Sequence, residues 1–472
     1  MIRRRVSAGV AAALVVALLT AVSADAHGFV GKRELPIPTW LFGWAAAAVL
    51  VISFVGLAAL WPHPRLEDAA ERRVLRLPRV LDPLCGGVGV LLFAGLIYAG
   101  LAGTQDVNSN IVPTVVYVAF WVGIPFVSLA AGDVFRAFNP WRAIGRAAGW
   151  LVQRIGGDGV PEPLNYPERL GRWPAVAGTV AFVVLELAVA DRDDPSVLAT
   201  LALAYAALQL VGMSLYGTRV WCERGDAFGV YFALFASLSA VRWTRDALRV
   251  RVPLSGTARV TPDTALVALV CVMVGSTSFD GFTGSAAWSS TVSGAQPRLL
   301  DLGLSAERTI EVMFTGGLLV AIALIAAMYL LGCRGMRSAV PSPTASTLGL
   351  ARRFAPTLVP IALAYVMAHY FGLLAYRGQA LAYLVSDPLG DGADLFGTAT
   401  ATINYGWISA TGVWYVQVAA VVLGHAAALA LAHDRALVLF PDPRTAARSQ
   451  RWMLAVMVAF TSLALYLLSS SE

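Results

Sequence analysis

The sequence predicts an all-α membrane protein, a polytopic bundle of about ten transmembrane helices, and three observations support this fold class. Hydrophobic residues make up 58% of the 472 residues and charged residues only 14%, with a mean hydropathy of +0.68. A soluble chain carries nearer a quarter charged residues. Apolar runs long enough to cross ~30 Å of hydrocarbon recur along the chain. The net charge of +6 comes without any nucleic-acid-binding motif, so we expect a lipid bilayer and no nucleic acid as partner.

Ten apolar runs are long enough to cross the membrane as helices. We expect these spans at residues 40–61, 81–103, 112–131, 173–190, 198–217, 263–279, 309–332, 354–376, 411–433 and 452–468. An eleventh apolar run, 227–241, is only 15 residues long. Its aromatic residues recur at i, i+3, i+4 and i+7, which is one face of a helix; they are Phe228, Tyr231, Phe232 and Phe235. We interpret this run as a re-entrant or interfacial helix.

The first 26 residues have the three parts of a cleavable signal peptide. Three arginines at 3–5 precede a short apolar run at 10–22, and the Ala-Asp-Ala triplet at 24–26 fits the small-residue rule for cleavage. Cleavage after this triplet leaves His27 as the first residue of a single transmembrane domain, 27–472. Cleavage two residues earlier and an uncleaved anchor are the alternatives.

The positive charges predict how the spans are oriented. If 227–241 does not cross, five loops on one side hold 26 Lys and Arg residues and the segments on the other side hold 6. If it crosses, the two sides hold 16 each. Because Lys and Arg are retained on the cytoplasmic side, we expect the first arrangement, with the mature N-terminus outside and 242–262 in the cytoplasm. Segment 132–157, which mixes Arg with Phe, Trp and Leu, is expected to lie on the inner membrane surface.

Four ionisable residues lie within predicted spans or at their outer ends, at similar depth from the outer surface. They are Glu186, Asp280, Glu311 and His369. A charge at such a position is costly unless it faces a protein interior or a cavity. We predict that Glu186, Glu311 and His369 line one outward-facing cavity that binds a cation or a polarised substrate. The alternative is scattered groups, each satisfied by its own neighbours.

A metal site is a related hypothesis. An N-terminal His27 offers an imidazole and an α-amine from one residue, and this pair of nitrogens chelates a transition metal such as copper or zinc. The arrangement resembles the histidine brace of copper monooxygenases, and His369 or Glu311 would complete the coordination. A free N-terminal histidine is the alternative. His425 and His433 lie eight residues apart on one span, too far along the axis to share an ion. For His425, a hydrogen-bonded core residue, a proton relay and a haem ligand stay open.

Four stretches of the chain resemble a known family. They are AHGFVGKRELPIPTWLFGWAAAAVLVISFV (26–55), DVFRAFNPWRAIGR (133–146), SDPLGDGADLFGT (386–398) and VQVAAVVLGHAAALALAHDRALVLF (416–440). They are similar to a family of bacterial membrane proteins catalogued as fenitrothion hydrolases, and the similarity covers most of the chain. The resemblance implies a protein of the bacterial inner membrane that hydrolyses an organophosphate triester, a small hydrophobic substrate.

No G-x-S-x-G or H-E-x-x-H pattern marks a hydrolytic site in the sequence. If the chain is a hydrolase, the expected chemistry is a metal-activated water held by Glu186, Glu311, His369 or His27. Two other classes compete with this hypothesis. Intramembrane acids and a half-length helix are typical of ion- or metal-handling transporters, although no internal repeat accompanies them. A membrane subunit of a copper or redox complex, working with partner subunits and with His27 or His425 as ligand, is the third class.

Overall fold

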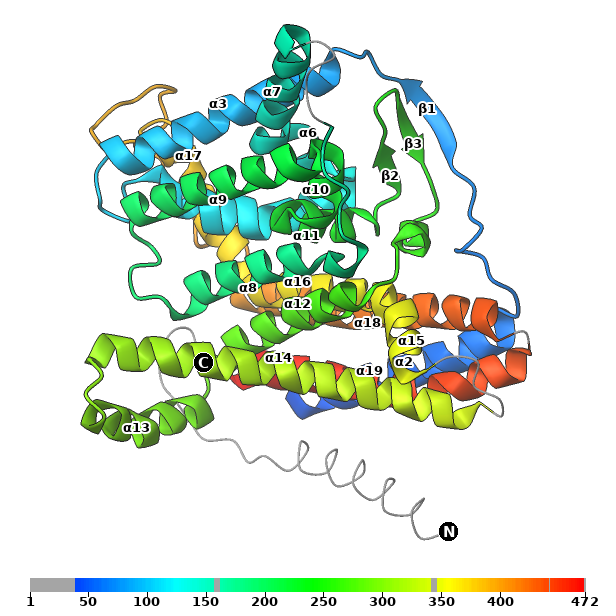
Figure 1. Ribbon diagram of the computed structural model, residues 1–472. Helices are drawn as coiled ribbons and strands as arrows, with labels where there is room; N and C mark the ends of the chain where they lie inside the picture. The colour runs from blue at the N-terminus through cyan, green and yellow to red at the C-terminus, as the bar shows by residue number, and fades with distance from the viewer. Residues whose placement is uncertain (1–38, 157–161, 341–345, 441, 471–472) are drawn as a thin grey trace.

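The computed structural model describes residues 39–156, 162–340, 346–440 and 442–470, which fold into a bundle of long helices (Figure 1). Within these residues, eight helical segments are long and apolar enough to cross a membrane. They are Leu81–Ala102, Ile111–Ala131, Glu168–Ala188, Pro195–Tyr216, Thr264–Thr283, Ala306–Ala339, Thr347–Leu384 and Ala410–Leu439. The protein is therefore an all-α, multi-pass membrane protein, as its composition predicts.

Every predicted span corresponds to a helix. The spans 40–61 and 452–468, which lie outside the eight segments, match α2 (Thr39–Leu60) and the second half of α19 (Pro443–Ser470), and these two helices pack together. The other elements are β1 (Arg72–Arg76), α3 (Leu81–Ala102), α4 (Ile111–Pro113), η2 (Thr114–Gly123), α5 (Ile124–Ala131), α6 (Val134–Phe138), α7 (Pro140–Gly156), η4 (Glu168–Leu170), α8 (Trp173–Ala188), α9 (Pro195–Tyr216), α10 (Thr218–Arg224), α11 (Ala227–Ala236), β2 (Val241–Trp243), β3 (Ala247–Val250), η5 (Ser255–Arg259), α12 (Thr264–Thr283), α13 (Ala286–Asp301), α14 (Ala306–Ala339), α15 (Thr347–Phe354), η6 (Ala355–Leu358), α16 (Val359–Arg377), η7 (Gly378–Ala380), α17 (Leu381–Leu384) and α18 (Ala410–Leu439).

The long helices run between two different ends of the bundle. Figure 1 places β1, β2, β3 and α15 at one end, which we call the sheet end, and α13 and α17 at the other, which we call the α13 end. The central helix α12 packs against α8, α14, α16 and α19, and most of its side chains are buried. The helices α16 and α18 approach closely at Gly424, where an added Cβ would meet the Ala364 side chain. The core therefore lies around α12, α16 and α18.

The run 227–241 folds as a short helix followed by a strand, which corrects the predicted end of the helix. The helix α11 stops at Ala236, and β2 begins at Val241. With 10 residues, α11 is too short to cross a membrane. It packs against α5, α8 and α16 inside the bundle. Its aromatic face meets Phe120 and Trp121, and the Trp121 ring stacks on that of Tyr231 with 4.5 Å between the centroids.

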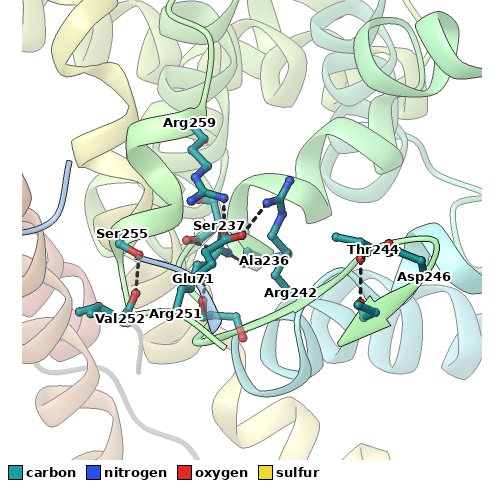
Figure 2. A network of polar contacts seen from close by, with 12 residues as sticks. Glu71, Ala236, Ser237, Arg242, Thr244, Asp246, Arg251, Val252, Ser255 and Arg259 are labelled. Carbon is teal, nitrogen blue, oxygen red and sulfur yellow. Dashed lines mark hydrogen bonds and ion pairs between the residues drawn. The ribbon is translucent and has the colours of Figure 1, made fainter. Parts of the chain in front are cut away.

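Arg251 explains why α11 ends where it does. Its guanidinium donates hydrogen bonds of 2.8 to 3.2 Å to the carbonyl oxygens of Ala236, Ser237 and Ser239 (Figure 2). A helix leaves its last carbonyl groups without partners inside the helix, and a cation there also interacts favourably with the helix dipole. A residue from the following loop thus closes the helix, and the apolar pattern of 227–241 gives no sign of it.

Glu71 joins this cap to the segment that precedes β1. Its carboxylate lies 2.8 Å from the Arg242 guanidinium, forms an ion pair with Arg259, and lies 3.9 Å from Arg251 (Figure 2). Burial would raise the pKa of Glu71, but hydrogen bonds from Arg259 and Arg242 outweigh it and hold the pKa below its ordinary value. Glu71 therefore stays ionised and fastens the chain between the first two spans to the loop after α11.

The three strands form a small antiparallel sheet in the order β1-β3-β2, which the all-α prediction did not include. Arg73, Arg249 and Arg242 occupy directly paired positions across it. Like charges placed opposite one another weaken a sheet, and Glu71 offsets part of this repulsion. The strands have three to five residues each. They are too short, and too rich in arginine, for the alternation of apolar and polar residues that predicts a strand to be clear.

Segment 132–157 contains two helices joined at Asn139. The N-terminal part of α7 is buried at Trp141, whereas Trp150 and Ile155 near its C-terminal end are 61% and 78% exposed. In Figure 1, α7 runs across the direction of α3. This geometry agrees with the expected surface-lying helix for the second half of the segment. The first half enters the bundle, because Gly89 of α3 lets the backbone of Phe138 approach closely.

A fully buried carboxylate, Asp226, holds the start of α11 in place. It accepts hydrogen bonds from Asn139 Nδ2 at 2.8 Å, Trp141 Nε1 at 2.7 Å and the Tyr205 hydroxyl at 2.8 Å. Burial of a carboxylate is tolerated only when hydrogen bonds replace its hydration. Asp226 therefore connects three segments of the bundle: the α6–α7 junction, α9 and α11.

Asp434 is a second carboxylate that joins separate segments of the chain, here at the sheet end. It accepts the Trp61 indole N–H at 3.0 Å and the backbone N–H groups of Arg65, Leu66 and Glu67 at 2.6 to 3.1 Å. The neighbouring Arg435 pairs with Glu67 at 2.8 Å. The end of α18 thereby holds the segment that leaves α2.

Candidate functional site

Asp280 and His369 form the centre of the candidate site. Asp280 lies near the α13 end of α12, and His369 lies in the second half of α16. His369 Nε2 is 2.8 Å from Asp280 Oδ2, and the two side chains are 28% and 23% exposed, respectively. Because the carboxylate of an ionised Asp280 can only accept, His369 then donates from Nε2. The pair is partly accessible, so it can exchange protons or bind a ligand.

Tyr370 connects this pair to Glu186. Its hydroxyl donates to Asp280 Oδ2 at 2.7 Å and lies 3.4 Å from Glu186 Oε1. The Tyr370 side chain is buried, and its ring packs edge-on against that of His369 at 4.6 Å. Three helices therefore meet at this point: Glu186 comes from α8, Asp280 from α12, and the adjacent residues His369 and Tyr370 from α16. We call these four residues the Asp280 cluster.

Aromatic side chains around Trp121, from the third predicted span, border Glu186. The Trp121 side chain lies close to Glu186 and packs on Phe182 at 4.7 Å and on Tyr231 at 4.5 Å. Trp121 belongs to η2, where the helix takes the wider π form over ten residues. Such segments are rare and recur at functional sites. Tyr117, one turn earlier, donates to the Arg192 carbonyl oxygen at 2.7 Å and so holds the loop after α8.

The local sequence explains how α12 brings Asp280 here. The residues before it include Ser276, Thr277 and Ser278, all buried. Their hydroxyl groups donate back to carbonyl oxygens one turn earlier on the same helix, which allows hydroxyl side chains in an apolar segment. Asp280 then lies within the last turn of α12, close to the α13 end, where its carboxylate can reach both residues of α16.

Glu311, the third predicted site residue, makes different contacts. Its Oε1 lies 3.4 Å from the Ala190 backbone N–H and its Oε2 lies 3.9 Å from Arg308 Nε. Glu311 therefore contacts the chain just after the end of α8, the helix that carries Glu186. Of the predicted trio, Glu186 and His369 belong to the Asp280 cluster, and Glu311 lies beside the end of α8. That all three residues line one cavity stays a prediction.

The predicted metal chemistry also stays a prediction. His27 lies outside the described residues. Among the residues described, no group of three or more His, Cys, Asp and Glu side chains is placed to hold a metal ion. The Asp280 cluster does offer carboxylate and imidazole donors, but its fourth member, Tyr370, links them through hydrogen bonds. As it stands, the arrangement is suited to holding protons.

Asp280 belongs to the cluster but not to the predicted trio of Glu186, Glu311 and His369, and neither Tyr370 nor Trp121 was among the predicted site residues. Tyr370 follows His369 directly, so the dipeptide His-Tyr within an apolar span was the available signal. The π-helical form of η2 has no comparable signal, since TVVYVAFWVG reads as an ordinary apolar helix.

The fold and the cluster together define a class: a multi-pass helical membrane protein with a titratable cluster among its spanning helices. No family model, curated protein or solved structure matches the chain. The resemblance to the fenitrothion hydrolase family therefore stays a prediction.

Proposed function

We propose that the Asp280 cluster binds a proton, or a cation that competes with it, and that the protein is an ion-coupled membrane transporter. The observation that carries this proposal is the position of the Tyr370 hydroxyl between two carboxylates, 2.7 Å from Asp280 and 3.4 Å from Glu186. A hydroxyl group has one hydrogen, so it can donate fully to only one of them.

The number of hydrogens indicates how the cluster holds a proton. With both carboxylates ionised, Tyr370 satisfies Asp280, and Glu186 receives no hydrogen from it. A proton on Glu186 completes the chain, because Glu186 then donates to Tyr370, Tyr370 donates to Asp280, and His369 also donates to Asp280. Like charges held close together favour sharing a proton. Titratable side chains inside spanning helices commonly mark proton or ion pathways, which supports transport.

Hydrolysis of an organophosphate triester is the second candidate, and the His369–Asp280 contact favours it. A carboxylate that accepts from one imidazole nitrogen fixes the tautomer and leaves the other nitrogen as a general base for water. His369 Nδ1 would then take a proton from the attacking water. The apolar surroundings suit a small hydrophobic substrate. The resemblance to the fenitrothion hydrolase family implies this same activity.

Proton uptake by the purified full chain in liposomes tests the first proposal. With pyranine trapped inside and a potassium–valinomycin potential imposed, wild-type vesicles should acidify faster than empty ones, and Glu186→Gln should abolish the difference. Glu307→Gln, the same change at an exposed residue in the first turn of α14, is the matched control and should keep it. Wild-type uptake no faster than that of empty vesicles would refute transport.

Turnover of fenitrothion by the detergent-purified protein tests the second candidate. Hydrolysis that His369→Gln abolishes and Glu186→Gln spares would favour the hydrolase over the transporter. The absence of wild-type turnover would remove this candidate.

We also propose that the chain lies in a bacterial inner membrane with the sheet end in the cytoplasm. The loops that hold 26 of the Lys and Arg residues include the strands and α15, as the retention of positive charge predicts. In a chain whose four cysteines are replaced, a cysteine at Asp391 should react with an impermeant maleimide on intact spheroplasts. A cysteine at Arg245 should react only after lysis, and labelling of this site on intact spheroplasts would reverse the orientation.

A further inference from the structure

His425, in the middle of α18, has one ring nitrogen in a hydrogen bond and one without a hydrogen-bond partner among the described residues. Its side chain is fully buried, and Nδ1 lies 2.7 Å from the carbonyl oxygen of Val421. A carbonyl oxygen can only accept, so Nδ1 carries the hydrogen. The neutral ring then presents a lone pair at Nε2, which has no hydrogen-bond partner among the described residues. A buried polar atom without a partner is destabilising, so a structural reason alone does not favour a histidine here.

His433, two turns further along α18, repeats this arrangement with the nitrogens exchanged. It is 2% exposed, and its Nε2 lies 3.0 Å from the carbonyl oxygen of Trp61. Nε2 therefore carries the hydrogen, and Nδ1 is the lone pair without a partner in the described part of the chain. The same helix thus holds two histidine bases in the interior, each with one ring nitrogen that has no partner among the described residues, about 12 Å apart along its axis at 1.5 Å per residue.

Polar groups connect the Asp280 cluster to the first of these bases. Tyr365 precedes His369 by one turn on α16, and its ring centroid lies 6.2 Å from that of His425. The Ser278 side chain, which donates to the Val274 carbonyl oxygen at 2.7 Å, lies close to Tyr365 and two residues before Asp280 on α12. Tyr365 itself donates to the Phe460 carbonyl oxygen at 2.7 Å. From the cluster, hydroxyl and imidazole groups therefore continue toward the sheet end.

The second base lies beside an acid at the sheet end. Glu67 donates its backbone N–H to Asp434, the residue that follows His433. Burial raises the pKa of the Glu67 carboxyl, although Arg435 beside it acts in the opposite direction. A carboxyl that holds a proton more readily than usual thus lies in the segment bound to the end of α18.

We propose that His425 and His433 carry protons between the Asp280 cluster and the sheet end, each accepting and releasing a proton at its free nitrogen. This inference rests on the proposed proton-linked function. At each step one N–H bond forms as the donor's bond breaks, and no electrons are transferred. The distance between the two rings requires intermediate carriers, and internal water bound to hydroxyl and imidazole groups can supply them.

The liposome assay separates this relay from a structural role. His425→Gln keeps an N–H that can donate to Val421 but has no titratable nitrogen. We expect it to lower proton uptake by about a hundredfold or more, the range that positioned proton-transfer groups contribute. His433→Gln should do the same. His63→Gln, the same change at an exposed histidine near the sheet end, should leave uptake unchanged.

The outcomes distinguish the relay from the function on which it rests. Wild-type uptake that Glu186→Gln abolishes but His425→Gln leaves intact would overturn the relay and keep the transporter. No uptake by the wild type would refute both. Thermal unfolding followed by tryptophan fluorescence shows which variants are folded. If His425→Gln is not folded, unchanged uptake in His433→Gln overturns the relay equally.

Discussion

Two carboxylates in this bundle are surrounded in contrasting ways. Asp226 is fully buried, and its three donors from Asn139, Trp141 and Tyr205 keep their hydrogens at neutral pH. Asp280 is partly exposed, and one of its two donors is a histidine, the side chain whose charge changes most readily near neutral pH. Both carboxylates lie among helices, yet only Asp280 shares a donor with a second carboxylate.

This contrast indicates what separates a structural acid from a functional one. A carboxylate with a complete set of permanent donors gains stability and has no reason to change its protonation. A carboxylate whose donors are titratable and shared can change protonation with little rearrangement. Asp434, with four donors from backbone and indole N–H groups, belongs with Asp226. The predictions below test this division.

The largest effect on stability is expected for Asp226→Ala. It leaves three buried donors without an acceptor, at about 1–3 kcal/mol each, so unfolding in detergent should occur at a much lower temperature or the protein should fail to accumulate. The matched control is Asp246→Ala, an exposed acid of the sheet end. Equal midpoints for the two variants, measured by tryptophan fluorescence, would contradict the role given to Asp226.

A pair of identical changes compares the two regions directly. Tyr370→Phe and Tyr205→Phe each remove a hydroxyl that donates to a carboxylate, and each should cost about 1 kcal/mol of stability. Only Tyr370→Phe should reduce proton uptake, by about a hundredfold, because its hydroxyl joins Glu186 to Asp280. Similar uptake by both variants would remove the functional distinction between the clusters.

Asp434→Asn should have a smaller effect on stability than Asp226→Ala. Asparagine keeps one acceptor oxygen for the segment 65–67 but loses the charge and the second oxygen, so we expect a loss of about 1–2 kcal/mol. The control is Asp68→Asn, an exposed acid of the same segment. Chemical unfolding in mixed micelles at neutral pH measures both, and a loss no larger than that of the control would show that Asp434 is dispensable.

The smallest effect is expected from Glu71, and it is a change in how stability depends on acid pH. Its pKa in the folded protein lies below the ordinary value of 4.5, so the ionised form favours folding. This contribution is complete above the unfolded pKa and is lost as the pH falls through the folded pKa. The unfolding midpoint of Glu71→Gln should therefore fall less than that of the wild type as the pH drops below about 4.5.

Glu67→Gln provides the control of opposite sign for this measurement. The pKa of Glu67 is raised, mainly by burial, so its contribution is present below the unfolded pKa and is lost as the pH rises through the folded pKa. Removing Glu67 should therefore improve stability at neutral pH relative to acid pH. The same trend for both variants would show that the two carboxyls are not set apart by their surroundings.

The amino-acid sequence alone determined the class of fold and which spans carry ionisable groups. Span length is a local property that follows from the thickness of the hydrocarbon layer, so the ten helices and the short α11 could be predicted. Only the tertiary structure decided which groups meet. Tyr370 and Glu186 are 184 positions apart, and their contact depends on α8, α12 and α16 packing side by side. The cap of α11 by Arg251, the sheet and the π-helical form of η2 likewise depend on neighbours that come from other parts of the chain. Helix order in a membrane is set by side-chain packing between helices, and no local pattern in one span records which span lies beside it.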